Sequence, residues 1–89
     1  MEHLSELELR HRLSEAEALV EKGARYAHYK HPEQSYSVIG FAIREDSQDV
    51  CVIYEAEYGE TIPFIRTLAS FVESVEVDGV SVPRFSRLP

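Results

Sequence analysis

Cysteine is nearly absent from the chain, and cations are few. The single cysteine, Cys51, excludes a disulfide within the chain. Its neighbours Val50, Val52 and Ile53 are apolar, which predicts a buried thiol that acts as a small hydrophobic side chain. A reducing compartment, in the simplest case the cytoplasm, therefore suits the protein best.

The chain has 9 Lys and Arg residues against 16 Asp and Glu residues, for a formal net charge of -7. Non-specific binding to nucleic acid or to an anionic membrane depends on Lys and Arg, so this balance disfavours both. No apolar run approaches the ~18 residues of a membrane span, and the first residues lack a basic-then-apolar signal pattern. A Gly-rich phosphate loop, a nucleophile elbow and a zinc-protease motif are also missing. A soluble protein without a common catalytic motif is expected.

The composition is that of one folded domain, with 44% hydrophobic and 28% charged residues in an 89-residue chain. A chain of this size buries only roughly 60 to 65% of its unfolded surface. A deep, enclosed active site is therefore not expected.

Residues 1–22 are predicted to form an amphipathic helix. Residues 5–22 contain no proline or glycine. Apolar residues recur on one helical face at Leu9, Leu13, Ala16 and Val20. Ser5 and Ser14 are each followed three residues later by glutamate, so either can start the helix through a capping box, and Gly23 is suited to end it.

The apolar face of this helix has two possible uses. It packs on the rest of the chain, which we favour because so small a protein needs every apolar contact. Alternatively it pairs with a second copy or with another protein, since its leucines have coiled-coil-like spacing over two heptads. The protein is accordingly expected as a monomer or a homodimer, and the helix is a candidate surface for a protein-interaction adaptor.

Residues 23–89 are predicted to form a small β-barrel. Strand-like segments are residues 24–29, 36–44, 50–58, 62–65, 75–77 and 80–82, with loops at 31–35 and 45–49. Asp78-Gly79 predicts a tight hairpin turn, because both turn positions require positive φ. Thr67 is expected to cap a single helical turn that reaches Phe71. Five or six short strands with tight turns are typical of a small barrel, so the predicted fold class is mainly β with an N-terminal helix.

The run from Gly23 to Lys30 is the most informative stretch, because it concentrates two tyrosines, a histidine and two cations in an acidic chain. Side chains alternate between the two faces of a strand. Tyr26, His28 and Lys30 therefore share one face, as a strip suited to binding, while the intervening residues share the other.

Several short segments, in this order and spacing, resemble the bacterial domain of unknown function 1653. They are Gly23, Tyr26-Ala27-His28-Tyr29-Lys30, Tyr36-Ser37-Val38-Ile39-Gly40, Val52-Ile53-Tyr54, Ile65-Arg66, Phe71, Asp78-Gly79 and Val82-Pro83-Arg84-Phe85. The resemblance covers residues 23–85 and implies a small SH3-like barrel with no known activity. Two positions depart from the family pattern: His31-Pro32 replaces a glycine after the His-Tyr-Lys run, and Arg66-Thr67 replaces Arg-Pro. The first departure predicts a stiffer loop.

A ligand site is predicted from five residues, which are Tyr26, His28, Lys30, Arg66 and Arg84. The cations suit a phosphate or a carboxylate, and the rings suit stacking on a base. Arg66 is the strongest candidate, because it follows an apolar strand and its planar fork suits bidentate recognition. In the competing interpretation the tyrosines fill the barrel and the cations pair with surface carboxylates.

Other chemistry is less well supported. His28 and His31 lack an evident third and fourth metal ligand, although His3, His11 and Glu33 are candidates, so we expect no metal site and no cofactor. Burial of Cys51 makes a Cys51–His28 nucleophile improbable. Glu55 and Glu57 share a strand face and are interpreted as a solvated edge rather than an acid and base pair.

The sequence thus favours a non-catalytic binding module for a small anionic ligand, a nucleotide or a peptide. An adaptor that works through the N-terminal helix remains an alternative. So does an enzyme of nucleotide or nucleic-acid modification, with His28 as general acid or base and Arg66 holding a phosphate.

Overall fold

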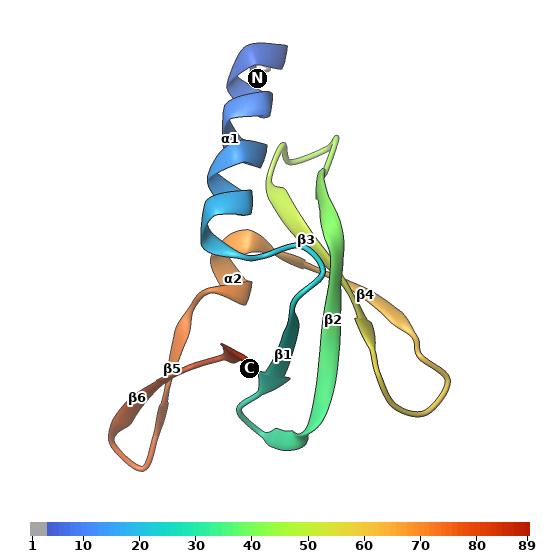
Figure 1. The fold of residues 1–89 in the computed structure, drawn as a ribbon. Helices are drawn as coiled ribbons and strands as arrows, with labels where there is room; N and C mark the ends of the chain where they lie inside the picture. Colours follow the sequence, from blue (N-terminus) through green and yellow to red (C-terminus); the bar gives the residue numbers. More distant parts are fainter. Residues whose placement is uncertain (1–3) are drawn as a thin grey trace.

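The computed structural model describes residues 4–89 and is mainly β with an N-terminal helix, as predicted (Figure 1). The elements are α1 (Glu6–Leu19), β1 (Arg25–His28), β2 (His31–Ile43), β3 (Val50–Ala56), β4 (Pro63–Thr67), α2 (Leu68–Phe71), β5 (Ser74–Val77), β6 (Val80–Pro83) and β7 (Phe85–Arg87). Neither helix within residues 4–89 is long and apolar enough to cross a membrane.

Helix α1 begins at Ser5, the first of the two predicted starts. The Ser5 hydroxyl accepts a hydrogen bond from the backbone N–H of Glu8, and the Glu8 carboxylate reaches back to the Ser5 backbone, which completes a capping box. The helix ends at Leu19, and Gly23 turns the chain with a φ of 86°. Residues 1–3 of the predicted helical segment lie outside the described residues.

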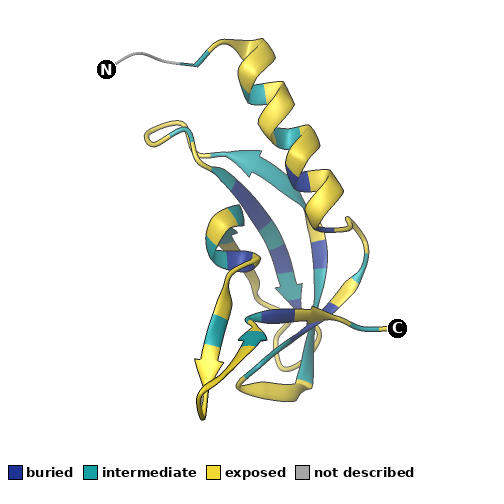
Figure 2. Cartoon of the chain, turned by 90° about the vertical axis from the view of Figure 1, so that its left-hand side faces the viewer, coloured by how far each residue is buried: buried dark blue, intermediate teal, exposed yellow. Residues whose placement is uncertain are grey.

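The apolar face of α1 packs on the chain's own sheet, against β2 and β3. Ala16 and Val20 are buried, and Leu9 and Leu13 are half-buried. Figure 2 shows that burial increases toward the C-terminal end of the helix, while its N-terminal end lies mostly in solvent. The packing that the sequence favoured, on the chain's own sheet, is therefore the one found.

The main sheet is antiparallel, five-stranded and ordered β4-β3-β2-β1-β7, and β5 and β6 form a separate hairpin. Because the edge strands β4 and β7 do not pair, the described residues form no closed barrel, and the barrel prediction is corrected to an open sheet. The sheet is nevertheless curled, since the guanidinium carbon of Arg66 on β4 lies 5.7 Å from the ring centroid of Phe85 on β7. Side chains from the two edges thus meet over one face, which we call the concave face.

Residues 31–35 were predicted as a loop, and this prediction is wrong, because they form the first part of β2. Ala27 lies opposite Ser35 and His28 lies opposite His31, so the residues between them on β2 bulge out of the ladder. Pro32 falls within this bulge, where its missing N–H breaks no ladder hydrogen bond. A proline that looked like a loop signal is therefore compatible with a bulged strand.

Other local predictions are confirmed. The loop after β2 is a hairpin connection, with Gln48 at a φ of 62°. Asp78 and Gly79 turn between β5 and β6 with φ values of 51° and 79°. The Thr67 hydroxyl accepts a hydrogen bond from the Ser70 N–H and caps α2.

Strand β7 was not predicted, since its three residues follow Pro83 and become a strand only by pairing with β1.

The core lies between the concave face and the two helices. Its buried residues are Val20, Tyr26, Val38, Val52, Tyr54, Phe71 and Phe85. Phe71 stacks on Phe85 with a centroid distance of 4.1 Å and an interplanar angle of 5°. Cys51 is buried as predicted, and this burial raises the pKa of its thiol.

Truncation of Phe71 is expected to destabilise the fold strongly. Phe71→Ala removes a ring that is 2% exposed and touches three aromatic neighbours, so the free energy of unfolding is expected to fall by about 3–5 kcal/mol. Leu7→Ala, at a residue 81% exposed, serves as the control and should change it by less than about 0.5 kcal/mol. Urea denaturation followed by circular dichroism measures both, and equal losses in the two variants would contradict this account of the core.

Candidate functional site

A cavity of about 240 Å³ opens on the concave face. It is lined by His28, Lys30, His31, Tyr36, Tyr54, Phe64, Arg66 and Phe85. Each of the five strands of the main sheet contributes at least one of these residues, and Lys30 comes from the turn between β1 and β2. The curl of the sheet therefore creates the cavity.

The floor of the cavity is aromatic. Tyr54 and Phe85 are 5% and 7% exposed and meet edge to face at 5.4 Å. Tyr36 contacts both rings, at 5.5 Å and 5.9 Å, and Phe64 forms an exposed part of the rim. The arrangement offers ring edges and faces to a planar apolar group.

Arg66 reaches the cavity because of strand alternation on β4. Phe64 and Arg66 point to the concave face, while Ile65 between them points away and is 60% exposed. The Arg66 guanidinium donates to the Ser70 hydroxyl at 2.9 Å and to the Tyr54 hydroxyl at 3.4 Å. Its hydrogen-bonding partners among residues 4–89 are neutral, and it forms no ion pair there.

His28 is a neutral hydrogen-bonding group at this site. Its Nδ1 accepts the backbone N–H of Lys30 at 3.2 Å, which leaves the proton of the neutral ring on Nε2. Burial lowers the pKa of His28, and the positive charges of Arg66, Arg84, Lys30 and His31 lower it further. The imidazole is therefore uncharged at neutral pH and presents an N–H donor.

The structure brings three of the five predicted site residues into one cavity: His28, Lys30 and Arg66. Tyr26 lies deeper in the core, where its ring meets Phe71 at 5.4 Å and its hydroxyl accepts the Glu21 N–H at 3.1 Å.

Arg84, the fifth predicted residue, does not line the cavity. It donates from Nε to the Ser70 carbonyl at 3.1 Å and lies 3.6 Å from the Glu73 carboxylate. Its charge still reaches the site, because it lowers the pKa of His28.

Sequence reasoning missed the aromatic half of the site together with His31. Tyr36, Tyr54, Phe64 and Phe85 come from four different strands, so only the strand register shows that they meet. A detectable signal was the alternation that places Phe64 on the same face as Arg66.

The Tyr36 hydroxyl lies 2.7 Å from that of Tyr58, and burial, with this hydrogen bond, raises the pKa of Tyr36 to about 12.

Other candidate chemistry finds little support in the part of the chain that is described. Residues 4–89 contain no group of three His, Cys, Asp or Glu side chains suited to a metal, and His3 lies outside the described residues. Cys51 does not line the cavity. Glu57 accepts from Ser35 at 2.6 Å and from Arg25 at 2.7 Å, and these bonds lower its pKa. Glu57 therefore serves a surface ion pair.

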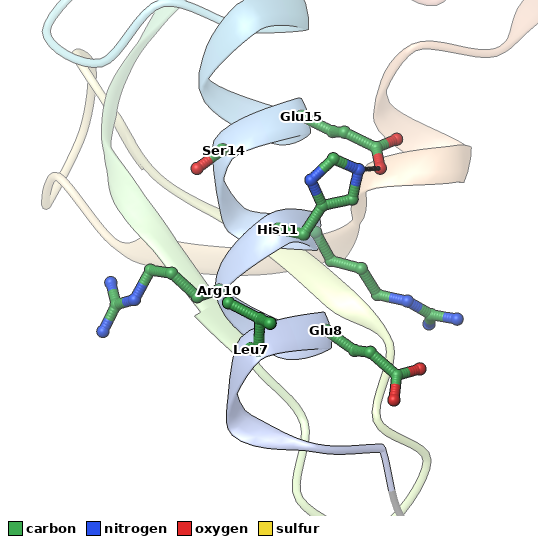
Figure 3. Close-up of a pocket in the computed structure, with 7 residues that line it drawn as sticks. Leu7, Glu8, Arg10, His11, Ser14 and Glu15 are labelled. Atoms are coloured by element: carbon green, nitrogen blue, oxygen red, sulfur yellow. Dashed lines mark ion pairs between the residues drawn. The ribbon is translucent and has the colours of Figure 1, made fainter.

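A larger concavity of about 660 Å³ runs along α1 (Figure 3). Exposed side chains of one helix line it, among them Leu7, Arg10 and His11, and His11 pairs with Glu15 at 2.9 Å. In Figure 3 these side chains point outward from the helix in different directions and do not converge on a common point. The concave-face cavity, to which five strands contribute, is the better candidate.

Comparisons with known proteins identify relatives without a known activity. The family described as Protein of unknown function (DUF1653) matches residues 24–87, which include every residue that lines the concave-face cavity. A crystal structure of a DUF1653 protein from Bordetella bronchiseptica is similar, with a TM-score of 0.65 and 26% identity over 75% of this chain and 86% of that chain. The comparison with curated proteins gives no match.

The charged surroundings of His28 predict how its pKa responds to substitution. Arg66 is the charged group that lowers it most. In Arg66→Gln the pKa of His28 is expected to rise toward its ordinary value of 6.5, by more than in Lys30→Gln. Proton NMR titration of the imidazole ring measures both changes, and an unchanged His28 titration in Arg66→Gln would show that the two side chains are not neighbours.

The lowered pKa of His28 also predicts a pH dependence of stability. The unfolded chain, in which the histidine pKa is about 6.5, takes up the proton before the folded chain does. The free energy of unfolding is therefore expected to fall as the pH drops from about 7 through 6.5 toward the folded pKa. Thermal unfolding of the wild type and of His28→Gln across this range tests the effect. Identical slopes would contradict it.

Proposed function

Because the chain belongs to the DUF1653 family of proteins of unknown function, we propose its function from the cavity itself: a non-catalytic module that binds a small, ring-bearing, nucleotide-like anion. Membership confirms the family resemblance seen in the sequence. We regard the curled sheet as an open form of the SH3-like barrel that this resemblance implied. We also propose the cytoplasm as the compartment of the protein.

One observation carries the proposal: the cavity is lined by two cations, two histidines and four aromatic rings, and by no carboxylate, in a chain with a net charge of -7. Cations on a folded protein usually pair with nearby carboxylates, and this chain has an excess of them. Lys30 and Arg66 have no ion-pair partner among residues 4–89. Their charge is therefore free to meet an anion from solution.

The geometry divides the work between polar and apolar groups. Arg66 is held by Ser70 and Tyr54, so its planar fork is positioned before a ligand arrives. The Nε2–H of His28 adds a neutral donor, and the exposed Lys30 adds a second charge at the rim. The rings of Tyr36 and Phe64 offer contact to a planar group.

An enzyme gains less support from these residues. The cavity lining contains no serine, threonine or cysteine to act as a nucleophile, and the Tyr36 hydroxyl, with its pKa raised to about 12, ionises with difficulty. His28 has its Nδ1 occupied by the Lys30 N–H and its proton on Nε2, so it is not arranged as a general base.

The adaptor hypothesis also gains less support. The apolar face of α1 packs against the sheet. The strongly exposed leucines of the helix are Leu7 and Leu19, with exposed fractions of 81% and 62%. Single apolar side chains of this kind are ordinary on protein surfaces.

Ligand binding is expected to raise the melting temperature and to depend on Arg66. A thermal-shift panel of AMP, GMP, CMP, UMP, inorganic phosphate and benzoate should contain at least one compound that raises it by more than about 2 °C near saturation. The shift should disappear in Arg66→Gln, because the variant loses the charge at the centre of the site.

Arg25→Gln is the matched control, since it removes the same charge from an ion pair with Glu57 outside the cavity. This variant should keep the shift. No response to any compound, or equal loss of the response in both variants, would contradict the proposed site.

A further inference from the structure

Not every basic side chain near the cavity is available to a ligand. His31 lies 3.7 Å from the Glu33 carboxylate, and Arg84 lies 3.6 Å from that of Glu73. Lys30 and Arg66, by contrast, form no ion pair within residues 4–89. The cavity therefore offers two uncompensated positive charges.

Two such charges match one phosphate monoester, which carries about -1.5 to -2 at neutral pH. A carboxylate carries a single negative charge and leaves one of the two cations unpaired. A triphosphate, or a strand of nucleic acid, brings further negative charges that find no free cation among the residues lining the cavity.

Two carboxylates flank the site, each beside a basic side chain. Glu33 lies on β2 beside the rim residue His31, and Glu73 follows α2 beside Arg84, whose charge reaches His28. A ligand group that extends beyond the cavity therefore meets carboxylates rather than free cations, in a chain whose net charge is -7.

The size of the cavity agrees with this limit. Its volume of about 240 Å³ lies below the roughly 300–1,000 Å³ of typical ligand pockets, and corresponds to the share of about eight liquid water molecules. One planar ring with part of its substituent fits that space. The aromatic floor of Tyr54 and Phe85 suits an uncharged ring.

We infer that the ligand is a ring-bearing phosphate monoester of the nucleoside monophosphate class, and that the cavity discriminates against polyphosphates and nucleic-acid strands. This inference rests on the proposed binding function and narrows its ligand. The ring and the single phosphate are both required, since the aromatic floor suits the ring and the two uncompensated cations suit the phosphate.

A series of related probes tests the requirement for the ring and the requirement for a single phosphate on the full chain. Isothermal titration calorimetry with AMP, GMP, CMP and UMP is expected to find binding for at least one, while its free nucleoside and ribose 5-phosphate each bind at least about tenfold more weakly. The matching triphosphate and a short oligothymidylate are also expected to bind more weakly than the monophosphate.

Substitution of the flanking carboxylates provides a second test, in which a gain in affinity is expected. The double variant Glu33→Gln, Glu73→Gln removes two negative charges beside the cavity and leaves Arg84 without its carboxylate partner, so it should improve the affinity for the triphosphate relative to the monophosphate by about threefold. The matched control is Glu15→Gln, Glu21→Gln, which makes the same change in net charge at pairs with His11 and Arg87 outside the cavity. The control should leave the ratio unchanged.

The outcomes separate this inference from the function beneath it. A triphosphate or oligothymidylate that binds as tightly as the best monophosphate overturns the inference and leaves the proposed anion site standing. An equal improvement in the two double variants overturns the local role of Glu33 and Glu73. If none of the probes binds, the proposed function fails together with the inference.

Discussion

The site depends on the position of one ring, that of Phe85. It stacks on Phe71 of α2 at 4.1 Å and meets Tyr36 and Tyr54 edge to face, and Arg66 lies over it from the opposite edge of the sheet. These contacts hold the short edge strand β7 turned toward β4, the opposite edge of the sheet, although β7 pairs with β1 alone. The sheet therefore stays curled without hydrogen bonds between its edges, and the space enclosed by the curl becomes the cavity.

Charge is separated across the molecule in a way that fits this architecture. Carboxylates outnumber cations, and some of them form ion pairs on the outer surface, such as Glu57 with Arg25. The concave face instead holds Lys30 and Arg66 beside a histidine kept neutral by burial and by the same cations. The proposed anion site rests on this contrast, because an acidic protein with such a face is expected to repel extended polyanions and to attract one anionic group locally.

Much of the fold could be predicted from local chemistry. The capping box at Ser5, the Thr67 cap and the turn at Asp78-Gly79 are encoded within a few residues, and each is present in the structure. Whether the sheet closes depends on pairing between β4 and β7, which are far apart in the sequence, and the strand character of residues 31–35 depends on their bulged pairing with β1, so propensity and turn signals were insufficient there.

Only part of the candidate site could be predicted, because pairing between strands decides which side chains meet there. His28 and Lys30 are close in sequence, and Arg66 was found because it follows an apolar strand. The aromatic residues of the floor come from separate strands, and only the register places them together.

The most direct test of the account is NMR mapping of backbone amides during titration with a nucleoside monophosphate. The account predicts that the perturbed amides cluster at His28, Lys30, Arg66 and Phe85. Perturbations confined to α1, or spread evenly over the surface, would contradict a binding site on the concave face.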